Sequence, residues 1–276
     1  MNIIEFISSN LSTFLALVAT GIFAGILAGL LGVGGGIVIV PVLFFLFQSF
    51  GVSPESAMLV ATATSLATIV PTSISSIRSH HHKGNVDFEL LKRWALFIFI
   101  GVLAGSWLVT RVEGTLLTLL FGVIATLSAL NMLLRTNKPA LFQKLPNSAG
   151  QSLMATLVGF FSAMVGIGGG TISVPLLSIY NYPTHKAVGT AAAIGLIISL
   201  PGALTMLAIG TTPVDAPVGT FGLVNVIAFA CIVPLTVLFA PVGATLAAKL
   251  DAGKLKKIFA VVLLITGVRM LGQLFL

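Results

Sequence analysis

The stretch "GLLGVGGGIVIVPVL", from Gly29 to Leu43, places five glycines inside a long apolar region. A second stretch, "SAMVGIGGGTISVPLL" from Ser162 to Leu177, repeats nearly the same pattern. Glycine destabilises a helix by about 1 kcal/mol relative to alanine. Each run of three glycines therefore predicts that one helix ends there and that a shorter helix begins immediately afterwards.

The composition around these stretches is typical of a membrane protein. Of the 276 residues, 57% are hydrophobic and 8% are charged, and the mean hydropathy is +1.13. Soluble domains carry roughly 25% charged residues, so these few charges cannot cover a water-exposed surface. We predict an all-α polytopic protein that crosses the plasma membrane several times, in a bacterium the inner membrane, with lipid around it.

The net charge of +7 agrees with this prediction. Basic residues accumulate in the cytoplasmic loops of membrane proteins, so the charge gives no reason to expect a nucleic-acid partner. The single cysteine, Cys231, excludes an intrachain disulfide. The first residues include Glu5 and no basic cluster, which favours a retained membrane segment over a cleaved signal peptide.

The apolar segments fall into two matching sets of five. Val40-Pro41 corresponds to Val174-Pro175, and Pro71 corresponds to Pro201. We predict a first transmembrane repeat over 1–135, a cytoplasmic linker over 136–150 and a second repeat over 151–276, together forming one transport unit. The expected segments are 11–31, 37–50, 56–77, 90–111, 115–135, 151–166, 171–181, 187–209, 221–247 and 255–275.

Loop charges predict how these segments are oriented. If all ten change sides, the basic loops 78–93 and 248–257 and the basic linker share one side, and both termini lie on the other. Because each half holds an odd number of segments, the halves are then inverted repeats. Inverted repeats are typical of secondary transporters with a site near the midplane. The short segments 37–50 and 171–181 are also compatible with half-helices that only partly cross.

The glycine runs supply the first candidate substrate-binding residues. A helix that begins inside the membrane has free N–H groups and the positive end of its dipole at that point. Two such ends, brought together by inversion, would attract an anion. The alternative is that the small residues only allow helices to pack closely. The candidates are Gly34, Gly35, Gly36, Gly168, Gly169 and Gly170.

Hydroxyl and basic side chains complete the candidate set. The stretch "ATATSLATIVPTSISS", Ala61 to Ser76, is rich in hydroxyls, which donate hydrogen bonds without adding negative charge. Such hydroxyls also commonly bond to their own or a neighbouring helix. Arg78 is either a gate or an anchor at the inner side, and Arg269 either faces the path or extends to the outer interface. The remaining candidates are Thr64, Ser65, Thr171 and Thr190.

Two other motifs point away from soluble-enzyme chemistry. A dinucleotide-binding G-x-G-x-x-G fails because its third glycine position holds Ile37 in one copy and Thr171 in the other. His80, His81 and His82 are consecutive and do not share a helix face, which favours a solvated cytoplasmic loop over a metal site. We expect no metal and no cofactor, although a membrane-embedded metal-dependent enzyme using these histidines is one alternative, and an anion channel is another.

The doubled GxGGGxxxVP pattern resembles the TauE/SafE family, the sulfite exporter or TSUP-type permeases. The stretches "GNVDFELLKRW" (Gly84–Trp94) and "GVLAGSWL" (Gly101–Leu108) are also similar to that family. The resemblance implies a bacterial or archaeal inner-membrane permease for a small sulfur-containing or organic anion. The matching residues are Gly32, Gly34, Gly35, Gly36, Val40 and Pro41, then Gly166, Gly168, Gly169, Gly170, Val174 and Pro175.

These observations lead to the hypothesis of a secondary transporter rather than an enzyme. Its substrate would be a small anion, sulfite or an organosulfonate, bound between two repeats that rock around a central site. All seven acidic residues lie in loops or at segment ends, so no membrane carboxylate is available for a coupling cation. The inside-negative potential favours anion efflux by about 2.3 kcal/mol per charge per 100 mV, so we expect export. A homodimer is a further expected assembly.

Overall fold

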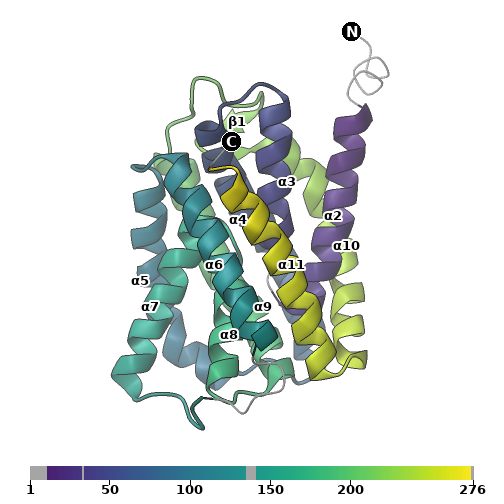
Figure 1. Cartoon of the computed structure of the whole chain (residues 1–276), viewed down its shortest axis with the longest axis vertical. Coiled ribbons are helices and arrows are strands. Elements are labelled where there is room, and N and C mark those ends of the chain that lie inside the picture. The colour runs from purple at the N-terminus through teal and green to yellow at the C-terminus, as the bar shows by residue number, and fades with distance from the viewer. Residues whose placement is uncertain (1–10, 33, 135–140, 275–276) are drawn as a thin grey trace.

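The computed structural model describes residues 11–32, 34–134 and 141–274 (Figure 1). This part of the chain holds ten helices and one short hairpin, labelled as in Figure 1. The first five helices are α2 (Leu11–Leu31), α3 (Gly36–Ser49), α4 (Pro54–His81), α5 (Phe88–Val109) and α6 (Gly114–Leu134). The rest are α7 (Ser148–Val165), α8 (Gly170–Ile179), α9 (Thr184–Ile209), α10 (Val226–Lys249) and α11 (Ala252–Gly272), with β1 (Thr220–Phe221) and β2 (Val224–Asn225) before α10.

The prediction of an all-α polytopic membrane protein is confirmed. Helices α4, α6, α7, α9 and α10 are long and apolar enough to cross a membrane. The bounds of the ten helices follow the ten expected segments closely, because long apolar runs separated by polar or glycine-rich turns leave few alternatives. The inverted relation of the two halves stays a prediction.

Side-chain caps explain where five of the helices begin. At each of these positions a side-chain oxygen accepts a hydrogen bond from a backbone N–H three residues later, which satisfies one donor of the first turn. The capping residues are Ser53 for α4, Asp87 for α5, Asn147 for α7, Asn225 for α10 and Asp251 for α11.

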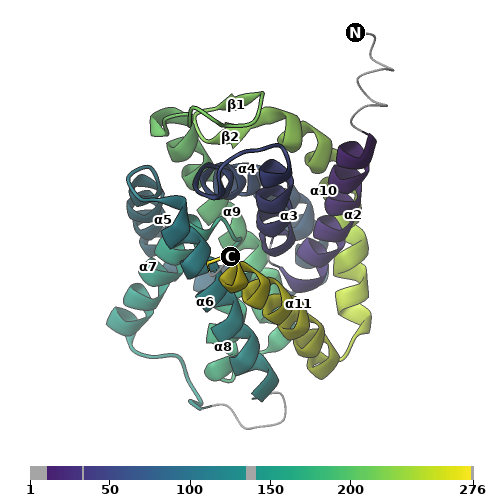
Figure 2. The ribbon, with the colours of Figure 1, turned by 45° about the horizontal axis from the view of Figure 1, so that its top comes forward.

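Helices α4 and α9 form the centre of the bundle. α4 packs along α9, while α3 packs on α4 and α8 packs on α9. Three helix pairs surround this centre, namely α2 with α10, α5 with α7, and α6 with α11 (Figures 1 and 2). Because every pair takes one helix from each half of the sequence, the two halves are interlocked rather than side by side.

Glycines bring the backbones of two of these pairs into direct contact. A methyl group at Gly29 of α2 would lie 1.8 Å from the Ala240 carbonyl oxygen of α10. A methyl group at Gly101 of α5 would likewise lie 2.1 Å from the Thr156 carbonyl oxygen of α7. Small residues at helix crossings are the usual means of close packing in membranes, so the packing role of glycine holds at these crossings.

The two ends of the bundle differ in charge. The start of α2, the end of α11 and the β-hairpin lie at one end, called here the hairpin end (top of Figure 1). The loops before α5, α9 and α11 lie at the opposite end with the described part of the linker, called here the linker end. Lys83, Lys186 and Lys249 belong to the linker end, while Glu55 and Asp215 belong to the hairpin end.

Helices α3 and α8 are half-helices. They contain 14 and 10 residues, whereas a helix needs about 20 residues to cross the hydrocarbon core. α3 lies in the half of the bundle near the hairpin end, and α8 lies in the half near the linker end (Figure 1). The structure therefore favours partly crossing short segments over ten full crossings, because each glycine run ends the preceding helix inside the protein.

Candidate functional site

The two glycine turns meet in the interior of the protein. Gly34 and Gly35 have φ angles of +68° and +83°, a left-handed conformation that glycine adopts without steric cost. A methyl group at Gly36 would lie 2.7 Å from the carbonyl oxygen of Gly166. The sequence prediction that both turns share one central place therefore agrees with the geometry.

The start of α8 leaves backbone donors unused. Its first residues are buried, and Gly169, at the N-cap position, provides no side-chain cap. Among the described residues, no acceptor receives the N–H groups of Gly169 and Gly170, whereas Thr171 and Ser173 donate back to Gly168 and Gly169. The positive end of the helix dipole thus lies inside the protein.

Three buried hydroxyls lie on α4, α8 and α9, the helices that meet near this helix start. Ser73 of α4, Thr171 of α8 and Ser199 of α9 are fully buried, and none of their hydroxyls has a hydrogen-bond partner in the described chain. A methyl group at Gly195 would lie 3.0 Å from Ser73 Oγ and 3.8 Å from the Gly169 nitrogen. Leaving a buried hydroxyl unpaired costs about 1–3 kcal/mol, so these groups mark a place for a polar ligand or water. We call the three hydroxyls and the two N–H groups the central site.

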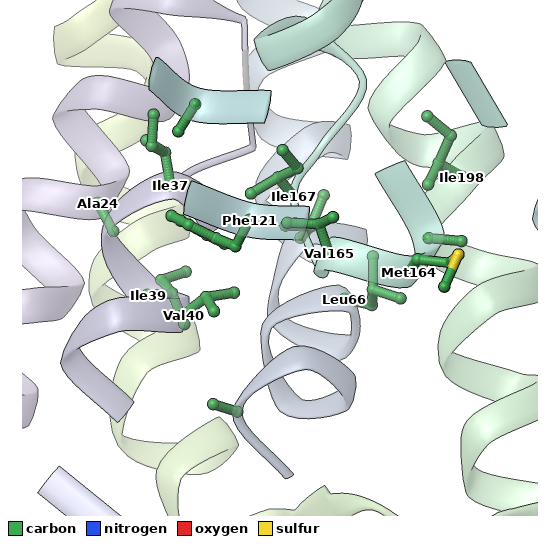
Figure 3. Close-up of a cluster of buried hydrophobic side chains, with 14 of the residues drawn as sticks. Ala24, Ile37, Ile39, Val40, Leu66, Phe121, Met164, Val165, Ile167 and Ile198 are labelled. Carbon is green, nitrogen blue, oxygen red and sulfur yellow. The ribbon is translucent and has the colours of Figure 1, made fainter. Parts of the chain in front are cut away.

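Apolar side chains close the space between the two turns. A methyl group at Gly34 would lie 2.5 Å from Ile69 Cγ2, and one at Gly36 would lie 2.9 Å from Ile69 Cδ1. Figure 3 shows Ile37 after the first turn and Ile167 in the second turn within the same buried cluster. In this conformation Ile69 and its neighbours separate the central site from the first turn.

A line of unpaired polar groups continues from the central site along α4. Thr62, Ser73, Ser76 and His80 lie within an arc of about 60°, at about 100° per residue. Each is buried, and each has a side-chain polar atom without a partner in the described chain. We call these four residues the α4 stripe. It reaches the linker end at His80.

Three candidate hydroxyls are already engaged in contacts between the halves. Ser65 Oγ donates to the Gly166 carbonyl oxygen at 2.7 Å and holds the second glycine turn. Thr64 Oγ1 accepts from the N–H of Asn225 at 2.8 Å, and Thr190 Oγ1 accepts from the N–H of Asp87 at 2.9 Å. These three hydroxyls therefore fit the alternative interpretation, in which a hydroxyl bonds to a neighbouring segment of the protein. Thr171, the fourth candidate, belongs to the central site instead.

The two candidate arginines lie outside the central site. Arg269 is exposed on α11, and its guanidinium carbon lies 4.7 Å from the ring centre of Phe45. Arg78 is exposed and lines a surface cavity of about 520 Å³ together with Pro71 of α4 and Pro241 of α10. At about 100° per residue, Arg78 falls on the face of α4 roughly opposite the α4 stripe.

The expectation of a solvated triple histidine is correct for two residues and wrong for the third. His81 and His82 are exposed, but His80 is 1% exposed, and its Nε2 lies 2.8 Å from the carbonyl oxygen of Gly29. The reason is helical phase, because α4 extends to His81 and turns the His80 ring toward α2. Within the described ranges, no group of three or more His, Cys, Asp or Glu side chains is placed to hold a metal ion.

Each end of the bundle carries an aspartate that joins the two halves. At the hairpin end, Asp215 accepts from Ser56 Oγ at 2.5 Å and from the N–H of Ser53 at 2.8 Å. The hydrogen bonds from Ser56 and then Ser53 lower the pKa of Asp215 to about 2. We call this group the Asp215 latch. It fastens the start of α4 to the loop after α9.

At the linker end, Asp87 accepts a hydrogen bond from the Tyr182 hydroxyl and caps α5. Burial, followed by this hydrogen bond, raises the pKa of Tyr182. Burial acts to raise the pKa of Asp87 as well, but hydrogen bonds from Tyr182 and the N–H of Leu90 outweigh it, so the pKa is lowered. We call this group the Asp87 latch. It fastens the start of α9 to the loop after α4.

Comparison with known proteins places the chain in one family. The model of the family described as "Sulfite exporter TauE/SafE" matches residues 17–270. A "Probable membrane transporter protein" of Haemophilus influenzae is 30% identical over 259 residues, which cover 94% of this chain and 98% of that protein. Probable membrane transporter proteins of Methanocaldococcus jannaschii and Bacillus subtilis are each 29% identical, covering 71% and 72% of this chain and 73% and 80% of their own lengths. No solved structure matches the chain. The chain belongs to the TauE/SafE sulfite exporter family, and the resemblance carried by its doubled glycine motif is confirmed.

Proposed function

We propose that this membrane transporter carries a small anion, sulfite or an organosulfonate, through the central site by alternating access. One observation carries the proposal: the helices that meet at the start of α8 hold three buried, unpaired hydroxyls, and the N–H groups of that start have no acceptor in the described chain. Hydrogen-bond donors without acceptors, combined with a positive helix end, suit an oxyanion. The sulfur in the substrate rests on the family description alone.

The charges near the central site support the same sign of substrate. Asp87 and Asp215 lie in loops at the two ends of the bundle, well away from the glycine turns along the chain. A hydroxyl binds an anion by donating its proton and adds no repulsion. The donors of the central site would replace the water that an oxyanion loses on entering the protein.

The interlocked helix pairs change which parts would move. Because α2 packs on α10 and α5 packs on α7, the two sequence halves cannot rock apart as blocks. We propose that α3 and α8 shift against α4 and α9 instead, with Ile69 leaving the space between the turns. The Asp215 latch and the Asp87 latch would open in turn at the two ends.

The orientation in the membrane follows from the loop charges. The lysines of the linker end support a cytoplasmic position for it under the positive-inside rule, so the hairpin end would face outside. In a bacterium this membrane would be the inner membrane. A cavity of about 430 Å³ beside Asp215, lined also by Phe50 and Asn225, would then open toward the outside.

The test is flux into liposomes that contain the purified full chain. Labelled sulfite should enter by counterflow against unlabelled sulfite and saturate with concentration, and sulfoacetate and taurine should compete better than sulfate or lactate. Thr171→Val should weaken counterflow, whereas the matched control Thr110→Val, at the exposed end of α5, should not. A flux that does not saturate and shows no counterflow would indicate a channel. Equal counterflow in Thr171→Val and Thr110→Val would show that the substrate does not pass through the central site.

A further inference from the structure

The protonation state of His80 follows from its contact with α2. Its Nε2 lies 2.8 Å from the carbonyl oxygen of Gly29, and a carbonyl oxygen can only accept a hydrogen bond. Nε2 therefore carries a hydrogen. In the neutral ring, Nδ1 then holds a free lone pair, and this atom is buried without any partner in the described chain. The structure thus contains a buried atom that can accept one proton.

The surroundings of His80 do not neutralise an added proton. The titratable groups that act on the ring are Lys83, in the loop after α4, and His185, in the first turn of α9, and both are basic. Lys83 Nζ is turned to α10, where it donates to the Ala244 carbonyl oxygen at 2.6 Å. Gly29 of α2 offers only its backbone. Within the described chain, no carboxylate is among the groups acting on His80, so a proton on Nδ1 would need a mobile anion to balance it.

The α4 stripe connects this atom to the central site. Ser73 lies next to the start of α8, and Ser76 and His80 follow on the same face of α4. Seven residues separate Ser73 from His80, a distance of about 10 Å at about 1.5 Å per residue. A proton on His80 and an anion in the central site would thus occupy the two ends of one buried polar line.

We propose that His80 binds one proton on Nδ1 for each anion that the protein carries, so that proton and anion cross the membrane together. This rests on the proposed transport function and adds the coupling ion. The proton comes from water on one side, forms the Nδ1–H bond, and returns to water on the other side when that bond breaks. Binding of either partner then favours the other by the same factor, since linkage between two sites is reciprocal.

Coupling to a proton alters the expected direction of transport. A monoanion that moves with one proton carries no net charge, so the membrane potential no longer drives efflux. The pH difference and the substrate gradient set the direction instead. An alkaline cytoplasm would draw the anion inward, which reverses the export expected from the absence of a membrane carboxylate.

The first experiment compares accumulation with exchange in liposomes that contain the full chain. With one pH unit imposed, acid outside, one-to-one coupling should concentrate a labelled monoanionic organosulfonate about tenfold inside, since one pH unit and a tenfold ratio are the same free energy. His80→Gln, which keeps an N–H for Gly29, should still perform counterflow but should lose the accumulation. The matched control His81→Gln, at the exposed neighbour, should keep both.

The outcomes separate this proposal from the proposed function. Tenfold accumulation by His80→Gln would overturn the role of His80 and leave the transport function standing. No counterflow by the unaltered chain would instead contradict the transport function itself. A pH-sensitive dye inside the liposomes gives a check that needs no variant when the substrate is an organosulfonate, which holds no proton of its own near neutral pH, because acidification must then accompany its uptake. Uptake without acidification would overturn proton coupling.

A second measurement applies if His80→Gln does not fold. The chain has four histidines, so a variant with His81→Gln, His82→Gln and His185→Gln retains His80 alone. Nitrogen-15 NMR of its labelled ring should show Nδ1 gaining a proton when sulfite is added at constant pH. An Nδ1 signal that stays the same at saturating sulfite would overturn the proposal.

Discussion

Helices α4 and α9 occupy the centre together, and their prolines Pro71 and Pro201 correspond in the two halves, yet their polar residues are placed differently. At the positions of the α4 stripe, the corresponding residues of α9 are small or apolar. Thr62, Ser73, Ser76 and His80 of α4 match Ala192, Ala203, Met206 and Gly210 of the second half. The two halves thus differ, because only α4 of the central pair carries the polar residues of the α4 stripe.

This difference shows what each copy contributes. The second half supplies the helix start of α8 with its free N–H groups and the hydroxyls of Thr171 and Ser199, while α4 supplies Ser73 and the imidazole of His80. An unpaired buried polar group lowers the free energy of unfolding. A second polar stripe on α9 would therefore destabilise the protein, and it would have no second helix start beside it with which to bind an anion. Four tests can contradict or refine this comparison, and they are described below from the largest expected effect to the smallest.

The largest effect should come from separating the two glycine turns on which both central helices depend. In Gly36→Ala the new methyl group would meet the Gly166 carbonyl oxygen and Ile167. Overpacking of this kind should lower the free energy of unfolding by about 1–3 kcal/mol, measured by thermal unfolding of the purified protein in detergent. Gly272→Ala is the control, because nothing lies within 4 Å of that position. Equal loss in both variants would argue against a contact between the turns.

The next effect tests the uneven chemistry directly. Ser73→Ala removes an unpaired hydroxyl, so the free energy of unfolding should stay the same or rise. Loss of a hydrogen bond to an anion, about 1.5–3 kcal/mol, should weaken substrate affinity by roughly ten- to a hundredfold, read from the concentration dependence of counterflow. The mirrored change Ala203→Ser on α9 should leave affinity as it is. If Ser73→Ala and Ala203→Ser changed substrate affinity equally, the α4 stripe would have no specific role in binding the substrate.

The glycine stretches and loop charges were sufficient to predict much of this arrangement. Three glycines in a row ended α2 and α7 where expected, because local backbone preference decides a helix end when no partner can compensate. The two glycine turns were expected to share one central place, and Gly36 does lie against Gly166, although the inverted symmetry behind that expectation stays a prediction. The pairing of α2 with α10 was not expected, because the sequence shows which helix faces are rich in glycine but not which two of them pack together.

The individual polar residues were harder to select. The stretch from Ala61 to Ser76 does carry buried hydroxyls without a partner in the described chain, yet Thr64 and Ser65 face helix ends from the other half. A helical wheel separates Thr64 from Ser73, because the two lie on opposite faces of α4, but it places Ser65 only about 20° from Ser76 and would not have separated that pair. His80 required knowledge that α4 continues to His81, because one turn of extra helix converts an exposed loop residue into a buried one.

A moderate effect should follow from loosening α4 at the hairpin end. The folded pKa of Asp215 is about 2, below an unfolded value of about 3.9. The latch is therefore complete above about pH 4 and is lost as the pH falls toward 2. Cys231, the single cysteine, lines the cavity beside Asp215, so its rate of labelling by a thiol reagent reports opening there.

We expect Asp215→Asn to label several times faster than the unaltered chain at neutral pH. Because the thiolate is the reactive form, labelling slows in all variants alike in acid. The ratio of the two rates is therefore the quantity compared, and it should fall toward one as acid opens the latch of the unaltered chain. Glu113→Gln, in another loop at the same end, serves as the control and should label at the original rate. Identical rates in all three proteins would mean that the Asp215 latch does not close this cavity.

The smallest effect is expected for the two exposed arginines, which tests whether the path follows the α4 stripe or the opposite face of α4. Arg78→Gln should change counterflow by no more than about twofold, because an exposed charge on the far face interacts weakly with the central site. Arg269→Gln should behave alike, with the loss of its contact to Phe45 lowering the free energy of unfolding by about 0.5–1 kcal/mol. A tenfold loss of sulfite affinity in Arg78→Gln alone would move the path to the cavity between α4 and α10, and the asymmetry of the central pair would then need another explanation.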